Sequence, residues 1–249
     1  TKELFVNLFS FCYTDFNKPN LNSKQGVFTM AKQSLKQQSY ELIKSNIINC
    51  VYPPGTIITE DILCQELEVS RTPIREALNR LETERLVTIL PKRGIEVTNI
   101  SLNELNMIYE TRLLIEPYAI LKHGCKISQQ QYLYFYRIFE SYQTEPVEET
   151  AYYEVDEQFH QLFIDATENS YLINTYQTVN SQISRTRILS CRASQDRLFY
   201  STREHLDIVK HVLSNNWDAA AQAMEQHLQA SKSSYFEYMM KQQNFLSMQ

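Results

Sequence analysis

One stretch constrains the fold of this chain more than any other: Val69–Leu86, VSRTPIREALNRLETERL. Ser70 offers a hydroxyl suited to an N-cap and Pro73 suits a first helical turn, which predicts a helix that begins at Arg71. At about 100° per residue such a helix has two distinct faces. The apolar face consists of Ile74, Ala77, Leu78 and Leu81. The polar face carries guanidinium, hydroxyl and amide groups from Arg71, Thr72, Arg75 and Asn79.

The polar face admits two interpretations. Forked donors suit guanine, an amide suits adenine and positive charge suits phosphate, so the face matches a DNA major groove. The alternative is an ordinary amphipathic surface helix with two solvated arginines. The chain has a net charge of −5, which by itself argues against DNA, but Ser70–Arg93 holds six Lys or Arg residues and three Glu. A local basic patch is sufficient for DNA contact, and an acidic remainder discourages unspecific binding.

Two further helices are predicted before this one. Apolar residues recur at helical spacing between Lys32 and Cys50, and Pro53-Pro54-Gly55 then predicts a turn. A second, shorter helix is expected to open at Thr59 or Glu60. Its expected inward residues are Ile62, Leu63 and Leu67. This order of helices is typical of a helix-turn-helix motif.

A β-hairpin is predicted after the motif. Two β-prone runs, Val87–Leu90 and Ile95–Thr98, flank the basic segment Pro91-Lys92-Arg93-Gly94. Three helices and a basic hairpin together predict a winged helix-turn-helix domain over residues 30–98. Residues 1–29 do not share its pattern, and we expect them to be an extension of unknown role.

Three lines of this domain resemble the DNA-binding domain of the GntR family of bacterial transcription regulators: PPGTIITEDILCQEL, VSRTPIREALNRLE and PKRGIEV. The resemblance implies that the start of the third helix reads an operator and that the hairpin tip enters the minor groove. The implied DNA contacts are Arg71, Thr72, Arg75, Arg93 and Gly94. Glu68 and Arg85 stand where the family usually has glycine, and a positive φ at either residue would cost on the order of 1 kcal/mol.

Cysteine usage and hydropathy bound the environment of the protein. The five cysteines are widely spaced with no C-x-x-C, so we expect neither a disulfide framework nor a zinc ribbon. No apolar run approaches the roughly 20 residues that span a bilayer. These features predict a cytoplasmic protein with no membrane partner.

Beyond Ser101 the pattern becomes helical throughout, which predicts a second domain over residues 101–243. Ser101 can cap a helix that runs to about His123 and ends at Gly124. Five more segments are amphipathic at a period of 3.6: residues 128–144, 148–167, 170–191, 195–214 and 217–240. The expected fold class is mainly α, with an N-terminal winged helix-turn-helix followed by an all-helical bundle.

Four side chains of the second domain predict a metal site. Asp156 and His160 are four residues apart on one helix and therefore project from one face. His205 and His227 lie on the apolar stripes of two later helices. Buried imidazoles and a carboxylate are costly without partners, and if they converge they offer three nitrogens and one oxygen to a divalent ion. Hydrogen-bonded core histidines are the alternative.

The strings DEQFH, REHLDIV and MEQHL resemble the metal-binding FCD (FadR C-terminal) branch of the GntR family. The ligands that this resemblance implies for a divalent ion, zinc or nickel above others, are Asp156, His160, His205 and His227. It also implies that Arg112, in ETRLLIEPYA, binds the carboxylate of an organic-acid effector. A surface ion pair with Glu116 is the alternative role for Arg112. Periodicity leaves open whether Arg185 or Arg187 points toward the same cavity.

The expected function is a homodimeric, DNA-binding transcription regulator whose operator affinity is controlled by a small organic-acid effector bound at the metal-containing cavity. Effector and operator would be coupled by roughly 1–3 kcal/mol. Two alternatives stay open: a regulator whose metal is structural or is itself the signal, and a metal-dependent hydrolase. The hydrolase is disfavoured because Glu157 and Glu204 are expected on the wrong sides of their helices, and because hydrolase and nucleotide-binding motifs are absent. We therefore expect a protein that is not an enzyme.

Overall fold

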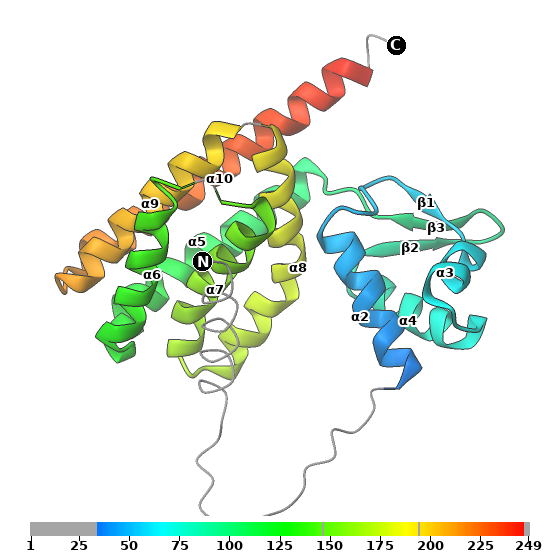
Figure 1. Ribbon diagram of the computed structural model, residues 1–249, viewed down its shortest axis with the longest axis horizontal. Helices are drawn as coiled ribbons and strands as arrows, with labels where there is room; N and C mark the ends of the chain where they lie inside the picture. The colour runs from blue at the N-terminus through cyan, green and yellow to red at the C-terminus, as the bar shows by residue number, and fades with distance from the viewer. Residues whose placement is uncertain (1–33, 146, 194, 247–249) are drawn as a thin grey trace, which may run out of the picture. The chain divides into compact units, whose positions relative to one another are not determined.

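The computed structural model describes residues 34–145, 147–193 and 195–246 (Figure 1). The predicted extension at residues 1–29 lies outside the described residues. Among the helices that are described, none combines the length and the hydropathy needed to cross a membrane. The described residues comprise a winged-helix part and a larger helical part.

Within the described residues, the winged-helix part contains three helices and three short strands. In chain order they are α2 (Leu35–Ile48), β1 (Ile57–Ile58), α3 (Glu60–Leu67), α4 (Arg71–Thr83), β2 (Val87–Leu90) and β3 (Gly94–Val97). The strands form an antiparallel sheet in the order β1-β3-β2, in which Ile57 pairs with Glu96 and Val87 pairs with Val97. Figure 1 shows α2, α3 and α4 gathered beside this sheet. The predicted helices and hairpin are confirmed, whereas β1, at two residues, is too short to show an alternating pattern.

The core of the winged-helix part comes from the apolar faces of all three helices and from the sheet. Its most buried members are Ile43, Ile47, Leu63, Ile74, Ala77, Leu78, Leu81, Leu86 and Val97. The expectation that Ile62 faces inward is wrong, since it is 44% exposed. Adjacent positions on a helix are turned by about 100°, and Leu63 already occupies the side that faces the core.

Local chemistry explains how these helices begin and end. Helix α3 begins at Glu60, one of the two predicted starts, and Thr59 caps it, because its hydroxyl accepts a hydrogen bond from the Ile62 amide. Ser70 occupies the N-cap position of α4 but makes no side-chain cap bond, so that expectation is wrong in its chemistry. Glu68 has φ 54° and Arg85 has φ 58°, so the two positions where glycine was anticipated do adopt the left-handed conformation. Both turns therefore form although the left-handed conformation is unfavourable for residues with a Cβ atom.

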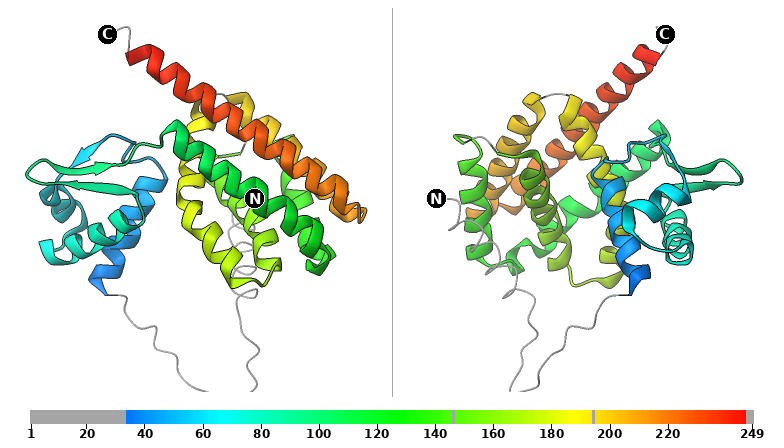
Figure 2. Two further views of the ribbon diagram at one scale, coloured as in Figure 1. Left: turned by 180° about the vertical axis from the view of Figure 1, so that it is seen from behind. Right: turned by 45° about the vertical axis from the view of Figure 1, so that its right-hand side comes forward.

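The helical part contains six α-helices among the residues described. They are α5 (Leu102–His123), α6 (Gln129–Ser141), α7 (Glu149–Ala166), α8 (Ser170–Ala193), α9 (Gln195–Leu213) and α10 (Trp217–Leu246), with a 3-10 turn η1 (Gly124–Lys126) after α5. Ser101 caps α5 through the Glu104 amide, and Ser128 and Gln131 form a capping box on α6. Figure 2 shows the long helix α10 lying along α5. The predicted all-helical fold and its six helices are confirmed.

The interior of the helical part is unusually aromatic around α6, α7 and α9. Phe159 of α7 contacts Phe135 and Phe139 of α6, with ring centroids 5.3 and 5.2 Å apart. The same Phe159 ring lies 5.1 Å from the imidazole of His205. Rings in offset or edge-to-face contact pack densely and restrict rotamers. They therefore form rigid walls around the polar cluster described below.

Candidate metal centre and nucleic-acid interface

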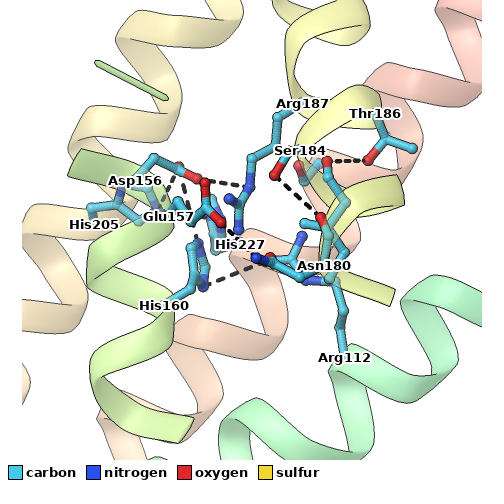
Figure 3. A network of polar contacts seen from close by, with 12 residues as sticks. Arg112, Asp156, Glu157, His160, Asn180, Ser184, Thr186, Arg187, His205 and His227 are labelled. Carbon is cyan, nitrogen blue, oxygen red and sulfur yellow. Dashed lines mark hydrogen bonds and ion pairs between the residues drawn. The ribbon is translucent and has the colours of Figure 1, made fainter. Parts of the chain in front are cut away.

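Three helices bring four potential metal ligands together in the interior of the helical part. Asp156 and His160 come from α7, His205 from α9 and His227 from α10, and all four are buried. One ligand atom from each lies within 4.8 Å of the others. Figure 3 shows these side chains converging between the helices. Residues separated by up to 71 positions in the chain thus share one small volume.

The ring nitrogens face a common point. His205 Nε2 lies 3.3 Å from His227 Nε2 and 3.5 Å from Asp156 Oδ1. His160 Nε2 lies 4.0 Å from the same aspartate oxygen. Within the part of the chain that the structure describes, His160 Nε2 is buried without a hydrogen bond. A buried acceptor without a donor is costly, so this arrangement favours a cation at the centre.

Two glutamates bind two of the imidazoles at Nδ1, on the side of the ring away from the common point. Glu116 Oε2 lies 2.6 Å from Nδ1 of His160, and Glu204 Oε2 lies 2.7 Å from Nδ1 of His227. When Nδ1 carries the proton and donates to a carboxylate, the lone pair is left on Nε2. Carboxylates in this outer position are the usual partners of histidines that bind metals. They orient the two rings toward the common point.

Electrostatics keep the four groups in the protonation states that metal binding requires. Burial lowers the pKa of His160 to about 4 and holds the pKa of His205 well below its usual value. It also lowers the pKa of His227. Burial acts to raise the pKa of Asp156, but the Arg187 guanidinium and the nearby imidazoles outweigh it and hold that pKa low. Near neutral pH the cluster therefore presents three uncharged imidazoles and one carboxylate.

This donor set fits a divalent ion. Three neutral nitrogens and one carboxylate oxygen are typical ligands of zinc, and imidazole also suits nickel and copper. The unpaired Nε2 of His160 and the two oriented imidazoles supply the structural reasons for that fit. The residues present are therefore sufficient to hold a metal.

The predicted effector residue Arg112 lies directly behind the cluster. Its Nε donates to Glu116 Oε1 at 2.6 Å, and the same oxygen accepts a bond from the Tyr176 hydroxyl at 3.1 Å. The alternative predicted a surface ion pair with Glu116, but both side chains are 0% exposed. Burial acts to raise the pKa of Glu116, yet Arg112 and His160 outweigh it and keep the group ionised. Arg112 Nη1 has no hydrogen bond among the described residues.

A small cavity opens beside the cluster. It is lined by Tyr152, Arg187, Arg197, Ser201 and Ser231, together with the ligands Asp156 and His227. Arg187 Nε pairs with Asp156 Oδ2 at 2.7 Å, as Figure 3 shows. Arg197 pairs with both oxygens of Glu204 at 2.7 Å. Two guanidiniums, each paired with a carboxylate, and three hydroxyls thus line the cavity and can donate hydrogen bonds to an oxygen-rich ligand.

The structure separates the two arginines that periodicity left open. Arg187 reaches the cavity, whereas Arg185 donates to the side chain of Gln182 and to the carbonyl of Thr98. Two residues on one helix are turned by about 200°, so both cannot face the same site.

The predicted DNA contacts lie on the surface of the winged-helix part. Arg71, Thr72 and Arg75 are exposed on the first turns of α4. Arg93 is exposed at the tip of the hairpin formed by β2 and β3, which we call the wing. Gly94 has a structural role of its own, with φ +119°. A Cβ built there would lie 2.7 Å from the carbonyl oxygen of Ile58 in β1. The wing therefore needs glycine at this position, and a DNA contact by Gly94 stays a prediction.

Comparison with known families identifies both parts of the chain. Residues 35–97 match the profile of "Bacterial regulatory proteins, gntR family", and residues 107–230 match the FCD domain. The Nta operon transcriptional regulator of Aminobacter aminovorans is 30% identical over 180 residues, which cover 72% of this chain and 83% of that protein. The chain belongs to the GntR family. The fold and the resemblance predicted from its sequence are confirmed.

Other relatives of this GntR regulator agree. The HTH-type transcriptional repressor RspR of Escherichia coli K12 is 28% identical over 79% of this chain and 87% of its own length. The crystal structure of a GntR transcriptional regulator from Rhodococcus sp. RHA1 has the same fold, with a TM-score of 0.70 at 18% identity over 82% of this chain and 99% of that one. The Nta operon regulator and RspR are transcription regulators and the chain belongs to their family, so this GntR regulator is a DNA-binding regulator and not an enzyme. The hydrolase alternative is excluded.

Three residues of the site in this GntR regulator escaped sequence reasoning. Glu204 was expected on the wrong side of its helix, yet its carboxylate contacts His227 of α10. Arg197 neutralises Glu204 from two turns earlier on α9, and Tyr176 completes the shell of Glu116. The seven-residue spacing of Arg197 and Glu204 was the one available signal, since it places both on one face of a helix.

Proposed function

We propose that this GntR regulator binds operator DNA as a homodimer and that a small organic acid, bound beside a divalent metal ion in the helical part, changes its operator affinity. The observation that supports this proposal most strongly is the convergence of one carboxylate and three imidazoles beside a cavity bordered by arginines. A ligand alters an equilibrium only by its differential affinity for the two states of the protein. The proposal therefore needs a site, a reading surface and a connection between them.

The proposed metal ligands are Asp156, His160, His205 and His227, with zinc or nickel as the ion. When bound, the ion supplies positive charge and open coordination positions for a carboxylate. Glu116 and Glu204 hold two of the imidazoles in place from the outer side. A metal that is only structural, or that is itself the signal, is the second candidate, because the cavity beside it is small and polar.

The proposed effector contacts are guanidiniums on two sides of the site. Arg112 holds Glu116 and keeps one amino group without a hydrogen bond within the described residues. Arg187 holds Asp156 and lines the cavity. Guanidinium and carboxylate form short, charge-assisted bonds, often in pairs. These contacts support a small carboxylate as the effector.

The proposed operator contacts are the exposed polar groups of α4 and the wing. Arg71, Thr72 and Arg75 would reach base edges in the major groove, and Arg93 and Gly94 would approach the minor groove. Two such helices about one turn of DNA apart would read a pseudo-palindrome. This geometry requires two copies of the chain.

Helix α5 offers a surface for the second copy. Its exposed apolar residues are Met107 (48%), Leu114 (70%), Tyr118 (46%) and Leu121 (39%). Their spacing of 7, 4 and 3 residues places them along one side of the helix. Monomeric proteins seldom expose a continuous apolar stripe, which supports a homodimer that covers it.

Helix α8 offers the connection between the effector cavity and the winged helix. It carries Arg187 at the cavity, while its Gln182 Nε2 donates to the carbonyl of Arg85 at 3.3 Å. Arg185 of the same helix is fully buried and donates to the carbonyl of Thr98. Arg85 follows α4, which carries the proposed major-groove contacts, and Thr98 follows β3, the last strand of the hairpin. A shift of α8 caused by a ligand at Arg187 would therefore reach both ends of the DNA-binding surface.

The deciding experiment measures operator affinity as a function of metal and acid. Full-length protein is stripped with a chelator, and a fluorescent operator duplex is selected from a random-sequence library. Fluorescence anisotropy then gives the Kd with Zn²⁺ or Ni²⁺ and with a panel of mono-, di- and tricarboxylates. We expect at least one acid to change the Kd about 5- to 150-fold, and only when the metal is present.

The controls separate the candidates. His211→Ala changes a half-buried histidine of α9 that pairs with Asp207 and lies outside the cluster, so this variant should respond as the wild type does. Arg185→Gln should still bind metal and acid but show a smaller change in operator affinity. A change in Kd caused by metal without acid would favour the metal as the signal. If no acid alters the Kd of the metal-loaded protein, effector control fails while DNA binding stands.

A further inference from the structure

Each of the two arginines of α4 that are proposed to reach base edges is paired with a carboxylate of the preceding helix, α3. Arg71 donates from Nε and Nη2 to Asp61 Oδ1, at 3.2 and 2.8 Å. Arg75 donates from Nε to both oxygens of Glu60, at 3.0 Å each. Both carboxylates stand in the first turn of α3. The same surface thus combines the positive charge suited to phosphates with two negative charges that oppose them.

The helix-turn-helix fold produces these pairs. The Thr59 cap starts α3 so that the next two residues, Glu60 and Asp61, form its first turn. The left-handed backbone at Glu68 then turns the chain into α4, where Arg71 and Arg75 are four residues apart and share a face. Acidic residues are common in a first helical turn because their negative charge interacts favourably with the positive end of the helix dipole. That role does not require contact with α4, yet both carboxylates receive bonds from it.

These ion pairs contribute little to the stability of the fold. Their significance lies in how they orient the arginine side chains. The side chains of Arg71 and Asp61 are 63% and 68% exposed, and those of Arg75 and Glu60 are 62% and 30% exposed. Ion pairs whose arginine is this exposed add little to stability. Glu60, however, binds only Nε of Arg75, so this pair leaves the two terminal amino groups available as donors. Guanine is recognised by two parallel donors reaching O6 and N7. A guanidinium held by its Nε is prepared for that contact, because less rotamer freedom is lost on binding.

The carboxylates also penalise unspecific binding. Contacts between arginine and phosphate release counterions and stabilise a complex on any sequence. A carboxylate beside the arginine opposes the approach of phosphate and leaves the net charge of the pair near zero. Correct base contacts would offset that penalty, whereas an incorrect sequence would not.

We propose that Glu60 and Asp61 are specificity-determining positioning residues, which direct Arg75 and Arg71 toward base edges and withhold them from phosphates. The inference rests on the proposed role of both arginines in reading DNA. It assigns to the carboxylates an effect on discrimination between sequences and none on the fold. Neither carboxylate needs to touch DNA.

The test compares Glu60→Gln and Asp61→Asn with the wild-type full chain. Both substitutions keep the size of the side chain and remove its charge. Glu76→Gln is the matched control, because Glu76 is an exposed carboxylate of α4 that pairs with Lys36 and not with either arginine. Affinity is measured for a selected operator duplex and for a scrambled duplex of equal composition over a series of NaCl concentrations. Thermal melting confirms that each variant is folded.

We expect the ratio of the two affinities to fall about tenfold in Glu60→Gln and in Asp61→Asn, mainly through tighter binding of the scrambled duplex. The slope of log affinity against log salt for that duplex should steepen by about one unit, as for one additional phosphate contact. Glu76→Gln should keep the wild-type ratio. An unchanged ratio in the two variants, or an equal fall in Glu76→Gln, overturns the inference.

A separate variant distinguishes this inference from the proposed function. Arg75→Ala should lose most of its preference for the operator. If that variant keeps the full preference, the reading role itself is wrong and the inference falls with it. If Arg75→Ala loses the preference while Glu60→Gln and Asp61→Asn retain it, the arginine reads DNA without the help of the carboxylates.

Discussion

Arginine–carboxylate pairs occur in both parts of the molecule, and they differ in burial. In the winged helix, the side chains of Arg71 and Asp61 are more than half exposed. In the helical part, Arg112 and Glu116 are wholly buried, and Arg187 and Asp156 nearly so. An exposed carboxylate can be exchanged for a phosphate or a base at little cost, whereas a buried one cannot leave without a large desolvation penalty. Exposed pairs therefore suit recognition, and buried pairs suit the fixed positioning of metal ligands.

The largest effect is expected when one buried pair is broken and compared with a broken pair on the surface. Arg112→Met removes the cation that lies against Glu116, a buried carboxylate whose remaining partners among the described residues are Tyr176 and His160. We expect the free energy of unfolding to fall by about 3–5 kcal/mol. Arg75→Met breaks a pair whose arginine is 62% and whose glutamate is 30% exposed, and it should leave the unfolding curve nearly unchanged. Urea denaturation of both variants provides the comparison, and equal destabilisation would refute it.

A second prediction concerns the backbone of the wing and not a side-chain contact. Gly94→Ala introduces a Cβ at φ +119° and 2.7 Å from the Ile58 carbonyl oxygen. We expect the free energy of unfolding to fall by roughly 1–3 kcal/mol and the wing to be displaced. Arg93→Ala, its exposed neighbour, should melt at the wild-type temperature. Differential scanning calorimetry measures both, and a wild-type melting temperature for Gly94→Ala would show that the wing tolerates other backbones.

A third prediction sharpens the comparison inside the helical part. Glu204→Gln weakens the partner of His227 Nδ1 without touching a ligand atom. Outer carboxylates of this kind typically account for 10- to 100-fold in metal affinity. Glu157→Gln is the matched control, since Glu157 lies on α7 and binds Asn180. Competition with a chromogenic chelator measures the affinities. Equal affinities in the two variants would mean that Glu204 does not orient the site.

The smallest effect is expected at the exposed tip of the wing. Arg93→Ala should weaken operator binding a few-fold and lower the salt dependence by about one unit, since one phosphate contact is lost. Anisotropy titrations at several NaCl concentrations test this. A loss confined to one operator sequence would instead indicate that Arg93 reads bases.

The difference between the two regions also explains what the sequence could predict. The DNA-binding motif is contiguous, so Arg71, Thr72 and Arg75 could be assigned to an exposed face from local periodicity and resemblance. The strand β1 could not, because its two residues are defined by their pairing with β3. Ser70 was placed correctly at the N-cap position, but it makes no side-chain cap bond, because such a bond depends on a rotamer that the sequence does not specify.

The cluster of potential metal ligands was predictable only in part. Asp156 and His160 are four residues apart, and His205 and His227 lie on apolar stripes, so helical periodicity places all four inside. Their partners arise from contacts between helices, as with Glu204 against α10, and periodicity describes one helix at a time. The burial of Arg112 is likewise a property of packing around α5.

Metal binding by the stripped protein tests the central claim most directly. Isothermal titration with Zn²⁺ or Ni²⁺ should show one ion per chain for the wild type and for His211→Ala, whose half-buried histidine on α9 is not part of the cluster. His205→Ala removes a nitrogen that faces both His227 and Asp156, and it should show no tight site. Tight binding of one ion by His205→Ala, with the wild-type affinity, would contradict the account.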